Sequence, residues 1–363
     1  MRWVVYVDMD AYYVACERRR RPELVGKAVI VGPPPHLGVF RGVVLSASYE
    51  ARAFGVHSAM PAEEAARRAP EAIWLPPDFA WYEATAREWH GVVRRFDERF
   101  QPRGIDEGSL AIDRSSPEEV RDVAQTIQRA IRDELGLSCS IGAAPDPVVA
   151  KIASDQAKPG GIRVVPPEEI RSFLAPLSVR AIPGIGPKTE AALRAIGCRT
   201  IADIARCDPI ALRRIVGSGS RALRQLALGR PMPEAPAPDP SAPRSRSVDR
   251  TFDQDQTESA EVVAHATELA TRLARELRSD GWQFGTVAVQ FTWADFSQTS
   301  RRHTLPAAAD GTATLAHEAG RLAQRLWTEG PPGQRRRVRT ISVRAESLRR
   351  RRPGQRTLDG KAP

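Results

Sequence analysis

The chain has 363 residues, of which 42% are hydrophobic, so it can build several domains with buried cores. Its 54 lysines and arginines exceed its 44 aspartates and glutamates by ten, which favours a polyanionic partner, either nucleic acid or an anionic membrane surface. No apolar run approaches the length of a spanning helix, and no signal-peptide core opens the sequence, so nucleic acid is the favoured partner and no membrane association is expected.

The four cysteines are scattered, and none belongs to a CxxC pair. Because the six histidines form no cluster either, this spacing predicts neither a disulfide framework nor a structural zinc site. It is typical of a reducing, cytoplasmic location. The cysteines are Cys16, Cys139, Cys198 and Cys207.

The first half of the chain predicts a layer of strands and helices. Residues 3–7 are β-branched and aromatic, as in a buried strand, and they run directly into Asp8. A second predicted strand, 109–113, follows the acidic pair Asp106-Glu107.

A helix over residues 117–135 is the most strongly marked element of this layer. Ser116 suits the N-cap, a proline opens the first turn, and Gly136 suits the C-terminal end. A strand and a second helix follow, over residues 138–144 and 147–157. The order of these elements predicts an α+β layer into which residues 11–77 are inserted.

The second half predicts a small helical region and a second α+β domain. Residues 166–230 contain short helical patterns with glycine-rich turns. Residues 231–243 carry six prolines among small residues, a composition typical of an interdomain linker. Beyond the linker we expect three strands and two helices, over residues 245–252, 286–293 and 339–345 and over residues 259–279 and 314–328.

Three carboxylates are the strongest candidates for chemistry. Asp8 ends one predicted strand, and Asp106 and Glu107 precede another, so all three converge at one sheet edge if the two strands are neighbours. Such a cluster needs cations to neutralise it, and oxygen ligands select hard ions such as Mg²⁺ or Mn²⁺. Two such ions about 4 Å apart would clamp the attacking and leaving oxygens of an in-line phosphoryl transfer.

Each acidic motif also has a plainer interpretation. Asp-x-Asp after a strand can be a turn, and an acidic dipeptide can be a solvated loop. A strand ending in Asp-x-Asp is also how haloacid-dehalogenase-type phosphatases present their nucleophile. Those sequences usually continue with Gly and Thr, whereas Ala11 and Tyr12 follow here.

Two further segments carry side chains suited to a triphosphate. Tyr49 and Arg52 are one helical turn apart, and a phenol hydroxyl and a guanidinium can bind the same phosphate group. Lys151 and Lys158 lie two turns apart on one helix face, and a Pro-Gly-Gly stop follows Lys158. The alternative is that both are surface lysines, with Lys151 paired to Asp155 four residues on.

Residues 182–188, Ile-Pro-Gly-Ile-Gly-Pro-Lys, carry a helix-hairpin-helix signature. Gly184 and Gly186 permit a tight turn that leaves backbone N–H groups at the start of a helix near Lys188, which binds phosphate without reading sequence. A plain turn between two helices is the alternative.

Arginines gather near the C-terminus. Those before the last predicted strand suit a sheet that lies along a phosphate backbone, and they are Arg335, Arg336, Arg337 and Arg339. A second run, Arg349–Arg352, can be no more than a solvated tail.

As a set, these motifs resemble the Y family of translesion DNA polymerases, in its DinB or DNA polymerase IV branch. The match covers roughly residues 1–345, and the set in this order is far more specific than any single motif. The motifs are Val7–Tyr13, Ser48–Arg52, Ile105–Glu107, Ala150–Asp155 with Lys158–Gly161, Pro183–Gly186 and Ser245–Val248.

The resemblance implies an α+β right-hand polymerase. It would have a ferredoxin-like palm, small inserted fingers, a helical helix-hairpin-helix thumb and a C-terminal α+β little finger. The implied boundaries are palm 1–10 and 78–165, fingers 11–77, thumb 166–230, linker 231–243, little finger 244–346 and a basic flexible tail 347–363.

The resemblance also implies roles for single residues. Asp8, Asp106, Glu107 and the Met9 carbonyl would bind two catalytic Mg²⁺ ions, for which Mn²⁺ can substitute. The incoming dNTP would be held by Tyr12, Tyr13, Ser46, Tyr49, Arg52 and Lys158. Tyr13 falls at the steric-gate position, where an aromatic ring excludes a ribose 2′-OH; if it is instead a core aromatic, Tyr12 would be the more exposed ring. DNA would be bound by Gly184, Gly186, Lys188, Arg246, Arg335, Arg336, Arg337 and Arg339.

The implied activity is low-fidelity, template-directed addition of dNTPs to a primer 3′-OH in translesion synthesis, by a monomer bound to primer–template DNA. Two alternatives stay open: a non-catalytic DNA-binding relative, and a phosphatase of the haloacid-dehalogenase kind. Near the end of the chain, Gln355–Leu358 partly resembles a sliding-clamp-binding peptide, so the clamp is a candidate partner. Two places depart from the family pattern: Gly104 replaces the usual Ser, and Gly108-Ser109 replaces the usual pair of a small and an aromatic residue.

Overall fold

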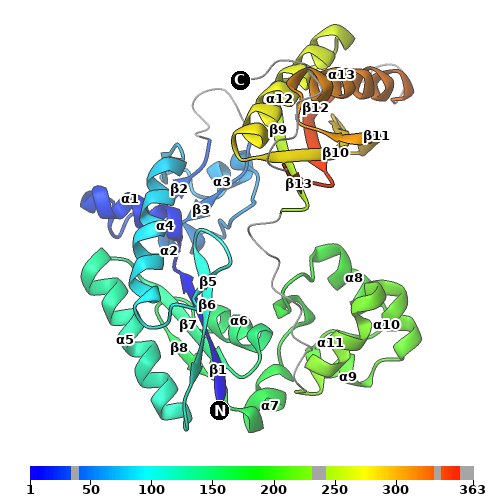
Figure 1. Cartoon of the computed structure of the whole chain (residues 1–363). Helices are drawn as coiled ribbons and strands as arrows, with labels where there is room; N and C mark the ends of the chain where they lie inside the picture. The colour runs from blue at the N-terminus through cyan, green and yellow to red at the C-terminus, as the bar shows by residue number, and fades with distance from the viewer. Residues whose placement is uncertain (34–40, 231–242, 331–336, 352–363) are drawn as a thin grey trace. The chain divides into compact units, whose positions relative to one another are not determined.

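The computed structural model describes residues 1–33, 41–230, 243–330 and 337–351. The chain divides into two compact units, Met1–Glu234 and Ala235–Pro363 (Figure 1). No helix within the described residues is long and apolar enough to cross a membrane.

The first unit contains three groups of elements. The elements of its main layer are β1 (Arg2–Met9), α1 (Tyr12–Arg20), α4 (Phe79–Arg94), β5 (Gln101–Pro102), β6 (Glu107–Asp113), α5 (Pro117–Leu135), β7 (Cys139–Ala144), α6 (Pro147–Gln156) and β8 (Ile162–Val164). A smaller group comprises η1 (Pro22–Leu24), β2 (Val29–Val31), β3 (Ser46–Ala47), α2 (Tyr49–Arg52), α3 (Ala62–Arg68) and β4 (Ile73–Leu75). The helical group comprises η3 (Pro167–Glu169), α7 (Ile170–Leu174), η4 (Val179–Ala181), α8 (Pro187–Ala195), α9 (Ile201–Arg206), α10 (Pro209–Val216), η5 (Gly217–Gly219) and α11 (Ser220–Ala227).

The main sheet has the order β5-β6-β1-β7-β8, with β1 at its centre and antiparallel to both neighbours. Alternate residues of β1 enter different cores. Trp3, Val5 and Val7 pack with helices α1, α4 and α5, whereas Tyr6 packs with α6 and the helical group. A strand that is buried on both faces explains why residues 3–7 form a continuous apolar run.

Helix α5 confirms the prediction for residues 117–135. The Ser116 side chain accepts a hydrogen bond from the Glu119 N–H at 3.3 Å, and Gly136 ends the helix at a φ of 65°. The adjacent strand β7 carries Gly142, where a side chain would meet the backbone of α6, since a Cβ there would lie 2.0 Å from the Ala150 carbonyl oxygen. Glycine therefore allows α6 to pack directly on the sheet.

The two smaller groups have their own cores. Strands β3-β2-β4 form a three-stranded sheet, in which β2 and β4 are parallel. Ile30, Val44 and Met60 are fully buried beside it. The helical group is buried around Leu193 and Ile201, which pack with residues of α6.

The second unit is a sheet covered on one face by two helices. Its elements are β9 (Ser245–Gln256), α12 (Ser259–Ser279), β10 (Trp282–Trp293), β11 (Gln298–Ala309), α13 (Thr312–Glu329), β12 (Val338–Glu346) and β13 (Arg349–Arg350). The strand order is β11-β10-β12-β9, and β13 pairs with the start of β10. Helices α12 and α13 pack against each other and on the same apolar face (Figure 1).

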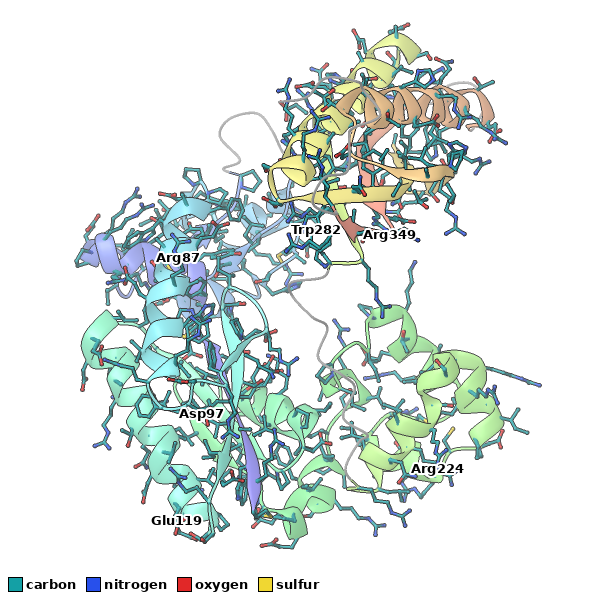
Figure 2. The ribbon with its side chains drawn as sticks, viewed as in Figure 1. Arg87, Asp97, Glu119, Arg224, Trp282 and Arg349 are labelled. Carbon is teal, nitrogen blue, oxygen red and sulfur yellow. The ribbon has the colours of Figure 1, made fainter. Side chains whose placement is uncertain are left out.

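Two strands of this unit correct the sequence analysis. Strand β11 was not predicted, because its polar and basic residues outnumber its apolar ones. Arg349 and Arg350 were expected in a flexible tail, but they pair with Gln283 and Trp282. Figure 2 labels Arg349 and Trp282, which lie close together on the two paired strands. The Arg350 guanidinium lies 4.1 Å from the Trp282 ring centre. The cation–π contact stabilises a short strand that sequence patterns do not mark. The predicted linker, residues 231–243, lies almost entirely outside the described residues.

Candidate active site

The three candidate carboxylates lie at one end of the main sheet. Strands β1 and β6 are neighbours, and their register places Asp8 directly opposite Glu107. Asp106 is tied to the same place, because the Met9 N–H donates to its carbonyl oxygen at 2.8 Å. Asp8 is only 3% exposed, whereas Asp106 and Glu107 are partly buried. Sheet pairing thus brings together acids that are about a hundred residues apart.

Two ammonium groups lie against these carboxylates. Lys151 Nζ is 2.5 Å from Asp8 Oδ2 and 2.9 Å from Glu107 Oε2, so it bridges the two strands. Lys158 Nζ is 2.7 Å from Asp8 Oδ1. The predicted pair between Lys151 and Asp155 also forms, at 3.2 Å. Lys151 is therefore a member of the acidic cluster rather than a surface lysine.

The electrostatics of the cluster follow from burial and from like charge. Burial raises the pKa of the Asp106 carboxyl, and the negative charges of Asp8 and Glu107 raise this pKa further. Burial alone would lower the pKa of Lys151, but the neighbouring Asp8 and Glu107 carboxylates outweigh it and raise that pKa. Negative charge is thus in excess at this end of the sheet, and cations stabilise it.

No group of three or more acidic, histidine or cysteine side chains among residues 1–33, 41–230, 243–330 and 337–351 is arranged to hold a metal ion. In this structure the Lys151 ammonium lies between Asp8 and Glu107. The donor set still fits a hard divalent cation. Its side-chain donors are all oxygens, and two cationic nitrogens already occupy positions beside Asp8.

Asp10 is a functional candidate that sequence reasoning missed. It is 4% exposed, and its carboxylate is surrounded by hydrogen-bond donors. Its carboxylate accepts hydrogen bonds from Ser138 Oγ (2.7 Å), Ser140 Oγ (2.8 Å), the Gly160 N–H (2.9 Å) and the Tyr49 hydroxyl (3.3 Å). Asp10 thereby connects Tyr49 to the loop that follows Lys158. The second aspartate of Asp-x-Asp was the signal that could have found it.

Tyr49 and Arg52 lie together, as their spacing predicts. They are the first and last residues of α2, and the Arg52 guanidinium lies 4.8 Å from the Tyr49 ring centre. Arg52 Nε donates to the Ala47 carbonyl at 3.0 Å, which leaves its terminal nitrogens for a ligand. Burial, followed by the negative charge of Asp10, raises the pKa of the Tyr49 hydroxyl to about 12. Tyr49 therefore stays a hydrogen-bond donor at neutral pH.

Tyr12 and Tyr13 differ in exposure. Tyr12 is 3% exposed, and its hydroxyl donates to the Tyr82 carbonyl at 2.7 Å, so its side chain cannot contact a nucleotide as was expected. Tyr13 is the more exposed ring, and it stacks on Tyr82 with ring centres 4.5 Å apart. Ser46 is buried in β3. Of these three candidates, only Tyr13 presents part of its side chain to solvent.

The two departures from the family pattern have different structural reasons. A Cβ at Gly108 would lie 2.3 Å from the Phe100 ring, so glycine is required where that ring covers β6. Phe100 is 5% exposed and packs edge-on against Trp89. A Cβ at Gly104 would lie 3.4 Å from Asp106 Oδ1, so a small side chain fits there. Only Gly108 is demanded by packing.

The helix-hairpin-helix segment has the expected turn. Gly184 has a φ of 88°, Gly186 is the N-cap of α8, and Lys188 is exposed in the first turn. Ile185 is buried between the two glycines, and the Arg180 guanidinium donates to its carbonyl oxygen. The turn is therefore fixed on its inner side, while its glycines and Lys188 face outward.

The open face of the second sheet carries arginines that sequence reasoning missed. Arg302 of β11 and Arg344 of β12 are both exposed. Each is the cross-strand partner of Ala288 on the central strand β10, Arg302 on one side of β10 and Arg344 on the other. They border a shallow depression lined also by polar residues, namely Gln290, Ser300 and Ser342. Strand β11 was not predicted, so the shared face of Arg302 and Arg344 could not be seen in the sequence.

The predicted DNA-binding arginines of this unit lie elsewhere or outside the described residues. Arg246 is opposite buried Ala345, on the helix-covered side, and its guanidinium is 2.6 Å from Asp280. Arg337 lies 3.6 Å from Asp255, and Arg339 lies over the Phe296 ring. Arg335 and Arg336 lie outside the described residues.

The fold resembles solved structures over almost the whole chain. A Y-family DNA polymerase chimera of Dbh and Dpo4 matches with a TM-score of 0.84 and 24% identity, over 95% of this chain and 99% of that chain. An insertion ternary complex of Dbh DNA polymerase matches with a TM-score of 0.63 at the same identity. The protein therefore has the right-hand fold of a Y-family DNA polymerase.

Sequence relatives define the branch. The impB/mucB/samB family model matches residues 7–155, its C-terminal domain model residues 243–358, and the IMS family HHH motif residues 167–197. A DNA polymerase IV of Methanoculleus marisnigri is 37% identical, covering 96% of this chain and 94% of the relative. A DNA polymerase IV of Halorhodospira halophila is 36% identical, covering 99% of this chain and 98% of the relative. The chain belongs to the DNA polymerase IV branch of the Y family.

Proposed function

We propose that the chain is a low-fidelity, template-directed DNA polymerase that extends a primer 3′-OH with dNTPs during translesion synthesis. The observation that carries this proposal is the pairing of β1 with β6, which sets Asp8 opposite Glu107 beside Asp106. Relatives of nearly equal length are named DNA polymerase IV. The phosphatase alternative is set aside, because the chain has a polymerase fold.

Membership of a DNA polymerase family implies dependence on divalent metal, and we propose two Mg²⁺ ions, replaceable by Mn²⁺. Asp8, Asp106, Glu107 and the Met9 carbonyl would hold them. When bound, they supply positive charge that activates the primer hydroxyl and neutralises the departing pyrophosphate. The ammonium of Lys158 then exchanges its carboxylate partner for the triphosphate.

The nucleotide is oriented by four side chains of this chain. Arg52 and Lys158 supply positive charge to phosphate oxygens, and the Tyr49 hydroxyl donates a hydrogen bond to them. Tyr13 stands against the sugar, where its ring leaves no space for a ribose 2′-OH. The stack of Tyr13 on Tyr82 supports this role, because it fixes the orientation of the Tyr13 ring.

DNA is held by phosphate contacts that do not read sequence. We assign this role to the turn of Gly184, Gly186 and Lys188 and to the open face of Arg302 and Arg344. Arg246, Arg335, Arg336, Arg337 and Arg339 stay proposed DNA contacts. In the right-hand nomenclature, residues 1–10 and 78–165 are the palm, 11–77 the fingers, 166–230 the thumb and 244–346 the little finger.

We further propose that the polymerase acts as a monomer in the cytoplasm and that Gln355–Leu358, which lie outside the described residues, bind a sliding clamp. The free thiols of Cys16, Cys139, Cys198 and Cys207 are consistent with a reducing compartment. Clamp binding predicts longer extension products when clamp is added; unchanged product lengths contradict it. Light scattering of the purified protein tests the monomer.

The decisive test is extension of a labelled primer–template with Mg²⁺ and each dNTP singly. Wild type should add the template-matched nucleotide, and Asp106→Asn should abolish the addition. Asp113→Asn, at the exposed far end of the strand that follows Asp106, is the matched control and should extend normally. No extension by wild type, with DNA binding retained, would instead support the non-catalytic relative.

A further inference from the structure

The tip of the β10–β11 hairpin has an unusual residue. Trp293 and Ser297 close the turn, since the Trp293 N–H donates to the Ser297 carbonyl at 2.9 Å. Three residues form the tip, Ala294, Asp295 and Phe296. Phe296 occupies the last position with a φ of 63°, in the left-handed region that favours glycine or asparagine. A bulky aromatic residue in this conformation costs free energy.

Folding does not account for the choice of phenylalanine. The Phe296 side chain is 67% exposed, so it contributes little to the core of the unit. The Arg339 guanidinium lies 4.5 Å from its ring centre, but an exposed cation–π contact is weak. Glycine would build the same turn without strain. A residue that is both strained and exposed points to a function.

The tip is fixed rather than loose. The Ala294 N–H donates to the Arg337 carbonyl at 2.8 Å, which ties the tip to the start of β12. The Asp295 carboxylate accepts hydrogen bonds from the Ser297 N–H at 2.9 Å and the Ser297 hydroxyl at 2.6 Å. An aromatic ring held in place loses little conformational entropy when a ligand stacks on it.

The neighbours of the ring select the ligand. Arg339 lies over the ring, and Arg337, half exposed, extends from the same end of β12. A flat ring beside guanidinium groups suits a nucleobase next to its phosphate, because the base stacks on the ring and the arginines neutralise the phosphate. Base pairs inside a duplex are already stacked on both faces, whereas an unpaired base can turn its face to this ring.

We propose that Phe296 is a stacking platform for an unpaired base of single-stranded DNA, flanked by Arg337 and Arg339. The proposal rests on the proposed function, because it requires that the second unit binds DNA. It adds that this unit contacts single-stranded DNA, which the arginine contacts alone do not distinguish from duplex DNA. The platform would bind the single-stranded extension of a primer–template rather than its duplex.

The test compares two labelled DNAs, a blunt duplex and the same duplex with a single-stranded 5′ extension, by fluorescence anisotropy with the full chain. Phe296→Gly should weaken binding of the extended DNA about tenfold, while its blunt-duplex affinity stays unchanged. Phe296→Tyr, which keeps the ring, should bind both DNAs like wild type, and Phe296→Leu should behave like the glycine variant. Thermal unfolding of Phe296→Gly should occur at the same or a higher temperature than wild type, because glycine relieves the strained turn.

Three outcomes would overturn the proposal. The first is an equal loss of affinity on both DNAs. The second is full retention of affinity by Phe296→Leu, which shows that no aromatic ring is needed for the contact. The third is unfolding of Phe296→Gly at a lower temperature than wild type, which makes the ring structural. The polymerase proposal is tested separately by primer extension. Suppose that wild type fails to extend primers while Phe296→Gly still loses affinity only for the DNA with a single-stranded extension. That pair of results would refute the polymerase proposal and leave the stacking platform standing.

Discussion

Asp10 offers the sharpest test of how the candidate nucleotide site is built. Its two oxygens divide four donors between them: Oδ2 accepts from Ser138 and the Gly160 N–H, and Oδ1 accepts from Ser140 and Tyr49. Asp10→Asn keeps the shape of the side chain but replaces one acceptor oxygen by an NH₂ donor. The Gly160 N–H cannot reverse its role, whereas the hydroxyl groups can. The amide nitrogen should therefore face Ser140 and Tyr49.

The magnitude follows from this geometry. Two hydrogen bonds to a charged acceptor become weaker contacts with an amide, which should lower the free energy of unfolding by about 2 kcal/mol. The Tyr49 hydroxyl must rotate to accept from the amide, so it no longer donates to a phosphate. We expect the KM for the matched dNTP to rise about tenfold, equivalent to about 1.4 kcal/mol, because a ground-state contact is lost. The kcat should change little, since Asp8, Asp106 and Glu107 are untouched.

Steady-state extension with one dNTP measures both constants, and urea unfolding measures stability. Ser138→Ala is the matched control, because it removes a donor from Asp10 without touching Tyr49. It should lose stability and keep its KM. The reasoning is refuted if Asp10→Asn lowers kcat with KM unchanged, or if Ser138→Ala raises KM as much as Asp10→Asn does.

Three further predictions concern other parts of the chain. Tyr13→Ala should raise ribonucleotide incorporation far more than it lowers deoxynucleotide incorporation, in extension assays with each sugar. Replacing Arg302 and Arg344 together by Gln should weaken DNA binding and reduce the slope of log affinity against log salt by about 2. Arg325→Gln, which changes an exposed arginine of helix α13, is the control and should leave this slope unchanged. Burial lowers the pKa of His90 to about 4, below the 6.5 of an ordinary imidazole, so the unfolded chain binds the proton first. Stability should fall by about 3 kcal/mol as the pH drops from about 6.5 to about 4, and His90→Phe should remove this part of the pH dependence in urea unfolding.

Each of these expectations has a contrary result. Equal losses with ribonucleotides and deoxynucleotides would mean that the Tyr13 ring only packs. An unchanged salt slope in the double variant would remove the open sheet face from the DNA surface. The same acid sensitivity in His90→Phe as in wild type would assign that sensitivity to other groups.

The sequence predicted those elements whose signals are local. Helix 117–135 has a cap, a first-turn proline and a terminal glycine, and the structure places its ends at the predicted residues. Helix 259–279 is also found with the predicted bounds, because its apolar residues recur with helical spacing. Strand β11 escaped prediction because one of its faces is polar and the other is covered only in part. Pairing with β10 stabilises it, and that pairing is not visible in β11 itself.

The same distinction applies to the site. Asp8, Asp106 and Glu107 were found because each borders a predicted strand, and the expectation required only that two strands be neighbours. Asp10 was missed because its role depends on partners more than a hundred residues away, Ser138 among them. The resemblance to a family names candidate substrate-binding residues, but it does not report which buried groups hold those residues in place.

Lys151 shows why the physical chemistry of the cluster has to be considered as a whole. An Asp8 carboxylate that is nearly buried beside a second acid is unstable without positive charge nearby. Lys151 supplies part of that charge from α6, where Asp155 and the Tyr6 ring, 5.1 Å from its Nζ, also hold it. The carboxylates can therefore come together when the chain folds, before any metal binds. A cation that later occupies the site replaces existing ammonium contacts, and it does not have to overcome the mutual repulsion of the carboxylates.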